Sequence, residues 1–350
     1  MKPETPASKS MTGVEKNHCL NVWKGIAAFA IVLIHCSFPS PVGGMMNGLA
    51  RFGVPLFFMI SGFFTYGKGM DTIKRRSQKC WRLFLTANGV YFLWKLADFF
   101  VTGELTSKAV LGLFSPQRLL NWILWNQSPF MGHLWFLGAL LYCYLFYGIL
   151  VKKDWQERCY ILIPVCLAAN LLLGEGLSMA GRKISFLWVR NFWLTGLPFF
   201  LLGHWFAREQ EKGRLRFYPG ISIALLIIGA VSSMGEMFLS GGSELYLGSI
   251  LMAVGSFSLA LWKPSFGKGS LLAHIGEKAA LHIYLWQMIV FDVTAALAHL
   301  CGVYEHMVYQ WVMPLWVGIV SWLLAEGLLG VKRLSGIKKG AVKNEQRGIG

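Results

Sequence analysis

Two polar residues interrupt the first apolar stretch of the chain, NVWKGIAAFAIVLIHC at residues 21–36, and both carry side chains capable of chemistry. Lys24 supplies a positive charge, and His35 supplies an imidazole that titrates near neutral pH and can act as a general base or a nucleophile. The two positions are eleven residues apart, which corresponds to three helical turns plus about 20° and a rise of roughly 16 Å. We therefore expect both side chains on one face of a helix, where they could line a route across part of a membrane.

A structural interpretation of the same residues is also open. Lys24 would then extend its ammonium group to the membrane surface, and His35 would be a hydrogen-bonded histidine at the interface. Arg51 lies on the next apolar stretch, which returns from the opposite side, so it is predicted at a depth similar to that of His35. The residues alone leave the structural and the catalytic interpretation equally open.

The composition indicates the element type that positions these residues. The chain of 350 residues is 55% hydrophobic and only 14% charged, whereas soluble domains carry about 25% charged residues. The formal net charge of +16 does not indicate nucleic-acid binding, because the basic residues cluster between apolar runs, as expected for membrane topology. The seven cysteines form no CxxC pair and no zinc spacing, so we expect no metal site.

Ten apolar stretches approach the length of about 20 residues that a helix needs to cross a bilayer. With the N-terminus in the cytoplasm, 25 of the 33 Lys and Arg residues fall in cytoplasmic segments, five in outer segments and three within spans. This asymmetry predicts an all-α, polytopic integral membrane protein with about ten transmembrane helices and both termini cytoplasmic. The predicted spans are 20–38, 46–66, 83–101, 133–151, 159–174, 190–207, 218–239, 245–262, 279–300 and 309–330.

The chain therefore divides into a cytoplasmic tail at 1–19, a transmembrane domain at 20–330 and a basic cytoplasmic tail without regular structure at 331–350. No soluble domain is visible between the spans. Lys95 and Asp98 lie three residues apart in the third span, which predicts an ion pair within that helix.

Several motifs, taken in order, resemble the membrane-bound acyltransferase family 3. The opening NVWKGIAAFAIVLIHCSFP is followed by RFGVPLFFMISGFF, which is similar to the family's first two helices. The later segments that resemble the family are KRRSQKCWRLF, MGHLWFLGALLYCYLF, LPFFLLGHWF and IGEKAALHIYLWQMIVF. The resemblance covers about residues 20–330 and implies an acyltransferase domain there.

The resemblance implies an O-acyltransferase that moves an acyl group, commonly acetyl, from cytoplasmic acyl-CoA to a hydroxyl of an extracytoplasmic cell-envelope polysaccharide or related acceptor. On this basis we assign catalytic roles to His35, as general base or transient acyl acceptor, and to Arg51, which would orient His35 or stabilise the oxyanion. Basic residues where CoA phosphates would arrive are assigned to acyl-CoA binding; these are Lys24, Arg75, Arg76 and Arg82. A loop that faces lipid headgroups is the alternative for the three arginines.

Three further residues are assigned, more weakly, to the acceptor side. His133 and Trp135 open the fourth predicted span there, and Gln287 stands where the family commonly has His. Lys24 likewise replaces the family's usual Arg, which keeps the charge and loses the bidentate fork. Acyl-CoA, with acetyl-CoA the expected form, would be a cosubstrate, and we expect no bound cofactor.

A second class of function remains open on the residues alone. Intramembrane Lys24, Arg51 and Lys95 would suit a secondary transporter or exporter of an anionic solute. For the acyltransferase we expect a multi-pass protein of the bacterial plasma membrane, with the lipid bilayer, acyl-CoA and a glycan or lipid-linked sugar as its partners. Because no extracytoplasmic domain is visible, a separate partner protein or a lipid carrier is expected to present the acceptor.

Overall fold

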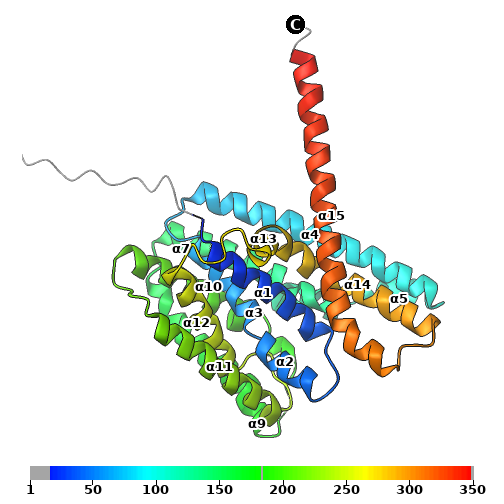
Figure 1. The fold of residues 1–350 in the computed structure, drawn as a ribbon, viewed down its shortest axis with the longest axis horizontal. Coiled ribbons are helices and arrows are strands. Elements are labelled where there is room, and N and C mark those ends of the chain that lie inside the picture. Colours follow the sequence, from blue (N-terminus) through cyan, green and yellow to red (C-terminus); the bar gives the residue numbers. More distant parts are fainter. Residues whose placement is uncertain (1–15, 183, 348–350) are drawn as a thin grey trace, which may run out of the picture.

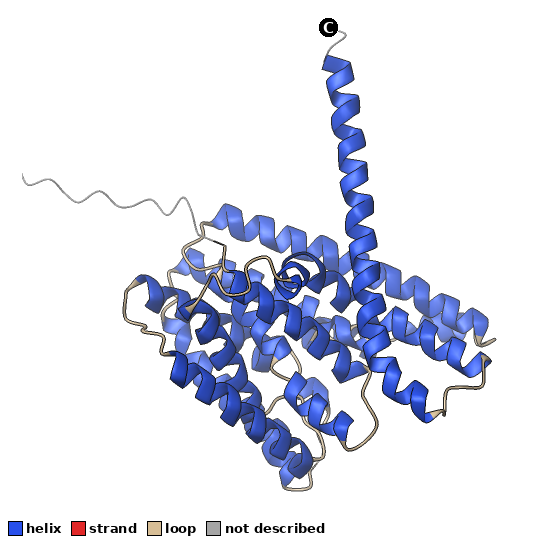
Figure 2. Ribbon diagram, viewed as in Figure 1, coloured by secondary structure: helices blue, strands red, loops and turns tan. Residues whose placement is uncertain are grey.

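The computed structural model describes residues 16–182 and 184–347, and within them every regular element is a helix (Figure 2). Figure 1 shows the helices packed into one bundle, from which the last helix projects. The first half contains α1 (His18–His35), α2 (Val42–Ala50), α3 (Gly53–Phe63), α4 (Met70–Val101), α5 (Ser107–Leu113), α6 (Pro116–Trp125), η1 (Gly132–Leu134) and α7 (Trp135–Lys153). The second half contains η2 (Arg158–Ile161), α8 (Leu162–Leu171), η3 (Leu172–Gly176), α9 (Leu177–Met179), η4 (Phe186–Trp188), η5 (Phe192–Gly196), α10 (Leu197–Glu211), α11 (Pro219–Ser240), α12 (Leu247–Trp262), α13 (Leu271–His274), η6 (Ile275–Ala279), α14 (Ala280–Leu300) and α15 (Met307–Arg347).

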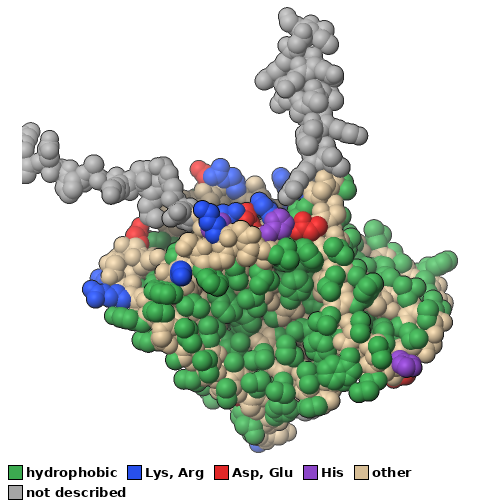
Figure 3. Space-filling view, in the orientation of Figure 1, with side chains coloured by type: hydrophobic (Ala, Val, Ile, Leu, Met, Phe, Trp, Pro, Cys, Tyr) green, Lys and Arg blue, Asp and Glu red, His purple; other side chains and the backbone are tan. Residues whose placement is uncertain are grey.

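Six helical stretches of the described chain are long and apolar enough to cross a membrane. They are His18–His35, Gly132–Lys153, Arg158–Met179, Pro219–Ser240, Leu271–Leu300 and Met307–Lys332. The other four predicted spans also coincide with helices, and that they cross the bilayer stays a prediction, as does the cytoplasmic location of the termini. Figure 3 shows a broad hydrophobic surface with charged side chains gathered along one edge, as expected for a protein embedded in lipid.

This charged edge is called the basic end below; it is the end at which α1 begins and from which α15 projects (Figures 1 and 3). Ion pairs at this end join Lys16 to Glu277 and His274 to Glu326. The end at which α1 finishes, at His35, is called the far end.

Three predicted helix boundaries differ from the structure. The second predicted span is interrupted at Arg51 and Phe52, so α2 and α3 are separate helices. Pro55, in the first turn of α3, has no backbone N–H, so it cannot make the hydrogen bond to the carbonyl of Arg51 that a continuous helix would contain. Helix α4 begins at Met70 rather than near residue 83, because its Lys, Arg and Gln residues favour helix although they are not apolar. Helix α15 likewise continues to Arg347, where we expected a tail without regular structure.

Close backbone contacts fix several helices of the bundle against one another. A Cβ atom at Gly62 of α3 would lie 1.8 Å from the carbonyl oxygen of Phe200 in α10, and one at Gly203 would lie 1.9 Å from the carbonyl oxygen of Met59. A Cβ atom at Gly276 of η6 would lie 1.8 Å from a carbonyl oxygen of α1. Only glycine permits such approaches, which membrane helices use because burial of apolar surface does not hold them together in lipid.

Candidate active site

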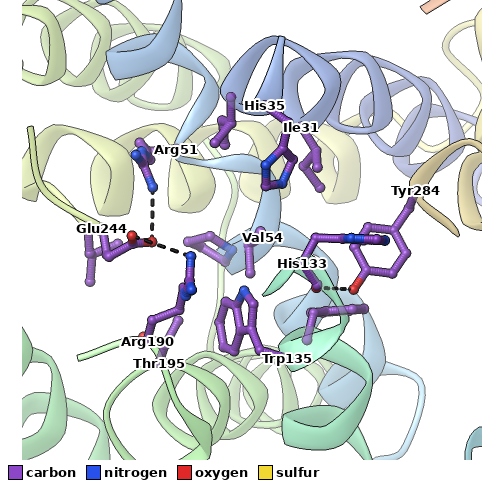
Figure 4. Close-up of a pocket in the computed structure, with 14 residues that line it drawn as sticks. Ile31, His35, Arg51, Val54, His133, Trp135, Arg190, Thr195, Glu244 and Tyr284 are labelled. Carbon is purple, nitrogen blue, oxygen red and sulfur yellow. Dashed lines mark hydrogen bonds and ion pairs between the residues drawn. The ribbon is translucent and has the colours of Figure 1, made fainter. Parts of the chain in front are cut away.

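A small cavity at the far end of α1, here called the histidine pocket, collects polar side chains from distant parts of the chain (Figure 4). Its volume is about 50 Å³, and apolar neighbours such as Ile31, Val54 and Phe136 complete its wall. The interruption between α2 and α3 falls at Arg51, which lines the pocket. The ionisable and hydroxyl-bearing residues that line it are His35, Arg51, His133, Thr195, Arg190, Glu244 and Tyr284.

Two histidines face one another in this pocket. The ring centroids of His35 and His133 lie 6.0 Å apart with the planes at 68°. Tyr91 and Tyr284 flank the His133 ring at 5.1 and 5.2 Å, and the Tyr284 hydroxyl donates a hydrogen bond of 2.5 Å to the His133 backbone carbonyl. His133 is 4% exposed and, among the described residues, neither ring nitrogen makes a hydrogen bond of standard geometry, although buried polar groups are normally paired. The imidazole of His133 is thus held in place and free to bind another group.

A carboxylate joins the two arginines of the pocket. Arg51 Nη1 donates to Glu244 Oε2 at 3.0 Å, and Arg190 Nη1 lies 3.6 Å from Glu244 Oε1 (Figure 4). Asn47 and Gln127 accept further hydrogen bonds from Arg51 and Arg190, respectively. Arg51 therefore shares a pocket with His35, as its predicted depth indicated, but its ion-pair partner is Glu244. Two guanidinium groups fixed beside an imidazole are able to stabilise a developing oxyanion.

A larger cavity of about 660 Å³, here called the basic cavity, lies toward the other end of α1. Lys24 and Arg82, both assigned from the sequence to acyl-CoA binding, line it. Lys79, Lys278 and Lys332 add three more cations, and Glu277, which pairs with Lys278 at 3.0 Å, adds one carboxylate. A neighbouring hollow of about 470 Å³ also has Lys24 and Lys79 in its wall and adds Arg76. This concentration of cations is suited to a ligand that carries phosphates.

Three side chains separate the two cavities. Ile31, Phe136 and Tyr284 line both the histidine pocket and the basic cavity. Lys24 lines one cavity and His35 the other, as the shared helix face predicted. The cavities are thus neighbours along α1, divided by a partition of one Ile and two aromatic rings.

The remaining predicted site residues are dispersed. Arg75 is exposed, bonds to Thr72 and lines neither cavity. Trp135 lines the histidine pocket. Gln287 is 1% exposed and its amide nitrogen and oxygen have no hydrogen-bond partner in the described part of the chain, yet it lies outside the lining of both cavities.

Sequence analysis did not single out several residues that the structure brings to these cavities. Glu244 lies in the loop between α11 and α12, in a predicted outer segment, and Arg190 lies before η5, at the start of a predicted span. Charged residues are rare in these outer regions, and that rarity was the signal that could have identified both. Lys79 lies three residues from Arg76 and from Arg82 on α4, so helical spacing places the three on adjoining parts of one face. Lys278 and Lys332 carried no local signal.

The apolar helices and the polar site enclosed among them define an integral membrane protein whose pocket chemistry suits group transfer. A family model described as "Acyltransferase domain" matches residues 17–328. The chain belongs to acyltransferase family 3, and it is a membrane acyltransferase. Neither the curated proteins nor the solved structures contain a match to it.

Proposed function

We propose that the protein is an O-acyltransferase of the bacterial plasma membrane. It takes an acyl group, acetyl in the first instance, from cytoplasmic acyl-CoA and transfers it to a hydroxyl of an extracytoplasmic glycan or lipid-linked sugar. Membership of the acyltransferase family favours this function over transport of an anionic solute.

The observation that carries the proposal is the placement of the basic cavity and the histidine pocket next to each other along α1. The basic cavity, with Lys24, Lys79 and Arg82 in its wall, suits the phosphates of CoA. The histidine pocket has room for a small acyl group and holds an imidazole and two guanidinium groups. A donor bound by its phosphates in the first cavity would pass its thioester beside Ile31 and Tyr284 toward the second.

His35 can act there in two ways. As an acyl carrier, its ring nitrogen attacks the thioester carbonyl, the C–S bond breaks, and CoA leaves as a thiol with the imidazole proton. The acceptor oxygen then forms a C–O bond as the C–N bond breaks, and the proton of the acceptor hydroxyl returns to the imidazole. As a general base, His35 instead takes the proton from the acceptor hydroxyl while that oxygen attacks the thioester directly, and the C–S bond then breaks as the imidazolium returns the proton to the departing CoA sulfur. In either case Arg51 and Arg190 would stabilise the negative charge that forms on the carbonyl oxygen.

The test compares wild-type and His35→Ala protein in liposomes for CoA thiol release from acetyl-CoA, with and without cell-envelope extract. We expect extract-dependent release by the wild type and none by the variant, provided that both have the same melting temperature. A stoichiometric burst of CoA without extract indicates the acyl carrier, and its absence indicates the general base. A folded wild-type protein that releases no CoA from any acyl-CoA overturns the proposal.

The donor side has a matched pair of lysines on α4. Both side chains are exposed, but Lys79 lines the basic cavity and Lys74 lies outside it. We expect Lys79→Ala to raise the KM for acetyl-CoA by roughly tenfold or more, because it removes a hydrogen bond between charged groups. Lys74→Ala should leave the KM unchanged. Equal KM values for the two variants would contradict a donor site in this cavity.

A further inference from the structure

A third cavity, of about 510 Å³, lies where α4 and α14 approach their far ends, and it is called the outer cleft here. Helix α4 contributes Trp94, Lys95 and Asp98 to its wall, α6 contributes Arg118, and α14 contributes Asp292. The segment 127–132, which leads into η1, forms another side. Neither the donor nor the catalytic residues discussed above lie in this cleft.

The charges of the outer cleft are balanced, in contrast to those of the basic cavity. Lys95 and Asp98 form an ion pair at 2.7 Å, which confirms the pairing predicted from their spacing. Trp94 Nε1 donates to Asp292 Oδ2 at 2.9 Å, so the indole and the carboxylate hold each other in position. Arg118 is exposed at the rim. Two carboxylates and two cations beside an aromatic ring offer both hydrogen-bond donors and hydrogen-bond acceptors. Because their charges cancel, the cleft has no net charge that would favour an anionic ligand.

The outer cleft adjoins the histidine pocket through the segment 127–133. Gln127 lines the cleft, and its amide oxygen accepts a hydrogen bond of 3.1 Å from Arg190 of the histidine pocket. Gly132 also lines the cleft, and the next residue, His133, lines the histidine pocket. The buried His133 ring nitrogens, which make no hydrogen bond of standard geometry to any described residue, therefore belong to the residue that directly follows the wall of a ligand-sized hollow.

We propose that the outer cleft binds the acyl acceptor as a sugar ring, an inference that rests on the proposed acyl transfer. Sugar hydroxyls both donate and accept hydrogen bonds, so the Asp98 and Asp292 carboxylates accept hydrogen bonds from them and Arg118 donates to their oxygens. The Trp94 ring provides an apolar face for the C–H groups of the sugar. The His133 imidazole bonds the hydroxyl that projects into the histidine pocket, and it is a positioning residue for the acceptor.

The experiment measures transfer of radiolabelled acetyl from acetyl-CoA by the full chain in liposomes. Two acceptor preparations are compared: the water-soluble polysaccharide of a bacterial envelope, and an organic-solvent extract that holds its lipid-linked sugars. Label in either preparation supports a sugar acceptor, and the preparation that is labelled identifies its source. CoA release by the wild type without label in either preparation overturns the sugar assignment.

The location of the site is tested with Asp292→Asn and Arg118→Ala. We expect each variant to lower kcat/KM for the acceptor by roughly tenfold or more, with the KM for acetyl-CoA unchanged. Arg118 is exposed, so its replacement leaves folding intact even if Asp292→Asn disturbs Trp94. Glu305→Gln, at an exposed carboxylate outside the cleft, is the matched control and should behave as the wild type.

The two proposals fail in different ways. If the wild type releases no CoA from acetyl-CoA, the acyltransferase mechanism itself is wrong. If the wild type transfers label but both cleft variants keep the wild-type kcat/KM for the acceptor, the mechanism stands and the outer cleft is not the acceptor site.

Discussion

The carboxylate that joins two arginines in the histidine pocket provides the sharpest test of the structure. Replacing Glu244 with Gln keeps the shape of the side chain and removes its charge. Arg51 and Arg190 would then lie in the same small pocket without a counter-ion. Breaking a buried ion pair by neutralising one partner costs about 3–5 kcal/mol, because the remaining charge is left uncompensated.

Partial exposure places the expected cost at or below the lower limit of that range. The Arg51 and Glu244 side chains are 16% and 23% exposed, so water screens part of the interaction. The ion pair to Arg190 is longer, at 3.6 Å, and adds less. We therefore expect Glu244→Gln to lower the free energy of unfolding by about 2–3 kcal/mol.

The measurement is an unfolding titration with a denaturing detergent, followed by tryptophan fluorescence. A double-mutant cycle with Arg51→Gln isolates the coupling, and the double variant should recover part of the loss since it removes one of the two stranded charges. Glu305→Gln serves as the exposed control. A loss for Glu244→Gln below about 0.5 kcal/mol, equal to that of the control, would show that this pair behaves as a surface salt bridge and would refute the reasoning.

Two further predictions concern packing and charge at the basic end. Gly62→Ala should keep α3 from packing against α10 and abolish the cooperative melting transition, because the added Cβ would overlap the Phe200 carbonyl. Gly89→Ala is the control: its Cβ meets nothing within 4 Å, so this variant should melt at the wild-type temperature or higher. Equal melting temperatures for the two variants would contradict the packing of α3 on α10. Hydrogen bonds from Arg208 hold the pKa of Glu157 below its usual range. The stability that this pair contributes is therefore fully present above the ordinary Glu pKa, and it is lost as the pH falls through the lowered pKa. Glu157→Gln should therefore lower the melting temperature at pH 7, with the difference from the wild type closing below about pH 4, and a difference that is constant with pH would exclude this origin.

The helical architecture and one face of α1 were predictable because both depend on short-range patterns. Hydropathy over about 20 residues identifies apolar helices, and the periodicity of 3.6 residues placed Lys24 and His35 on a common face. The same periodicity predicted the ion pair of Lys95 and Asp98. These features need no knowledge of which helices are neighbours.

The composition of the pockets was less accessible because it depends on contacts between distant segments. Arg51 and Glu244 are separated by 193 positions, and no local pattern relates them. The interruption at Arg51 was hidden within a continuous apolar run, and the start of α4 was hidden by charged residues that are good helix formers. Hydropathy reports which residues prefer lipid, and it does not report where a helix bends or begins.

The glycine contacts of the bundle give the walls of the basic cavity unequal stiffness. Phe57 and Ser61 belong to α3, whose backbone is pressed against that of α10, and Gly276 belongs to η6, which is pressed against α1. Lys79 and Arg82 of the same wall belong to α4, whose only internal glycine, Gly89, faces open space. Helix α4 is therefore held by its side chains, such as Tyr91, whose hydroxyl donates to the Leu285 carbonyl, and we expect the long side chains of Lys79 and Arg82, rather than the backbone of the cavity, to adjust when a bulky nucleotide enters.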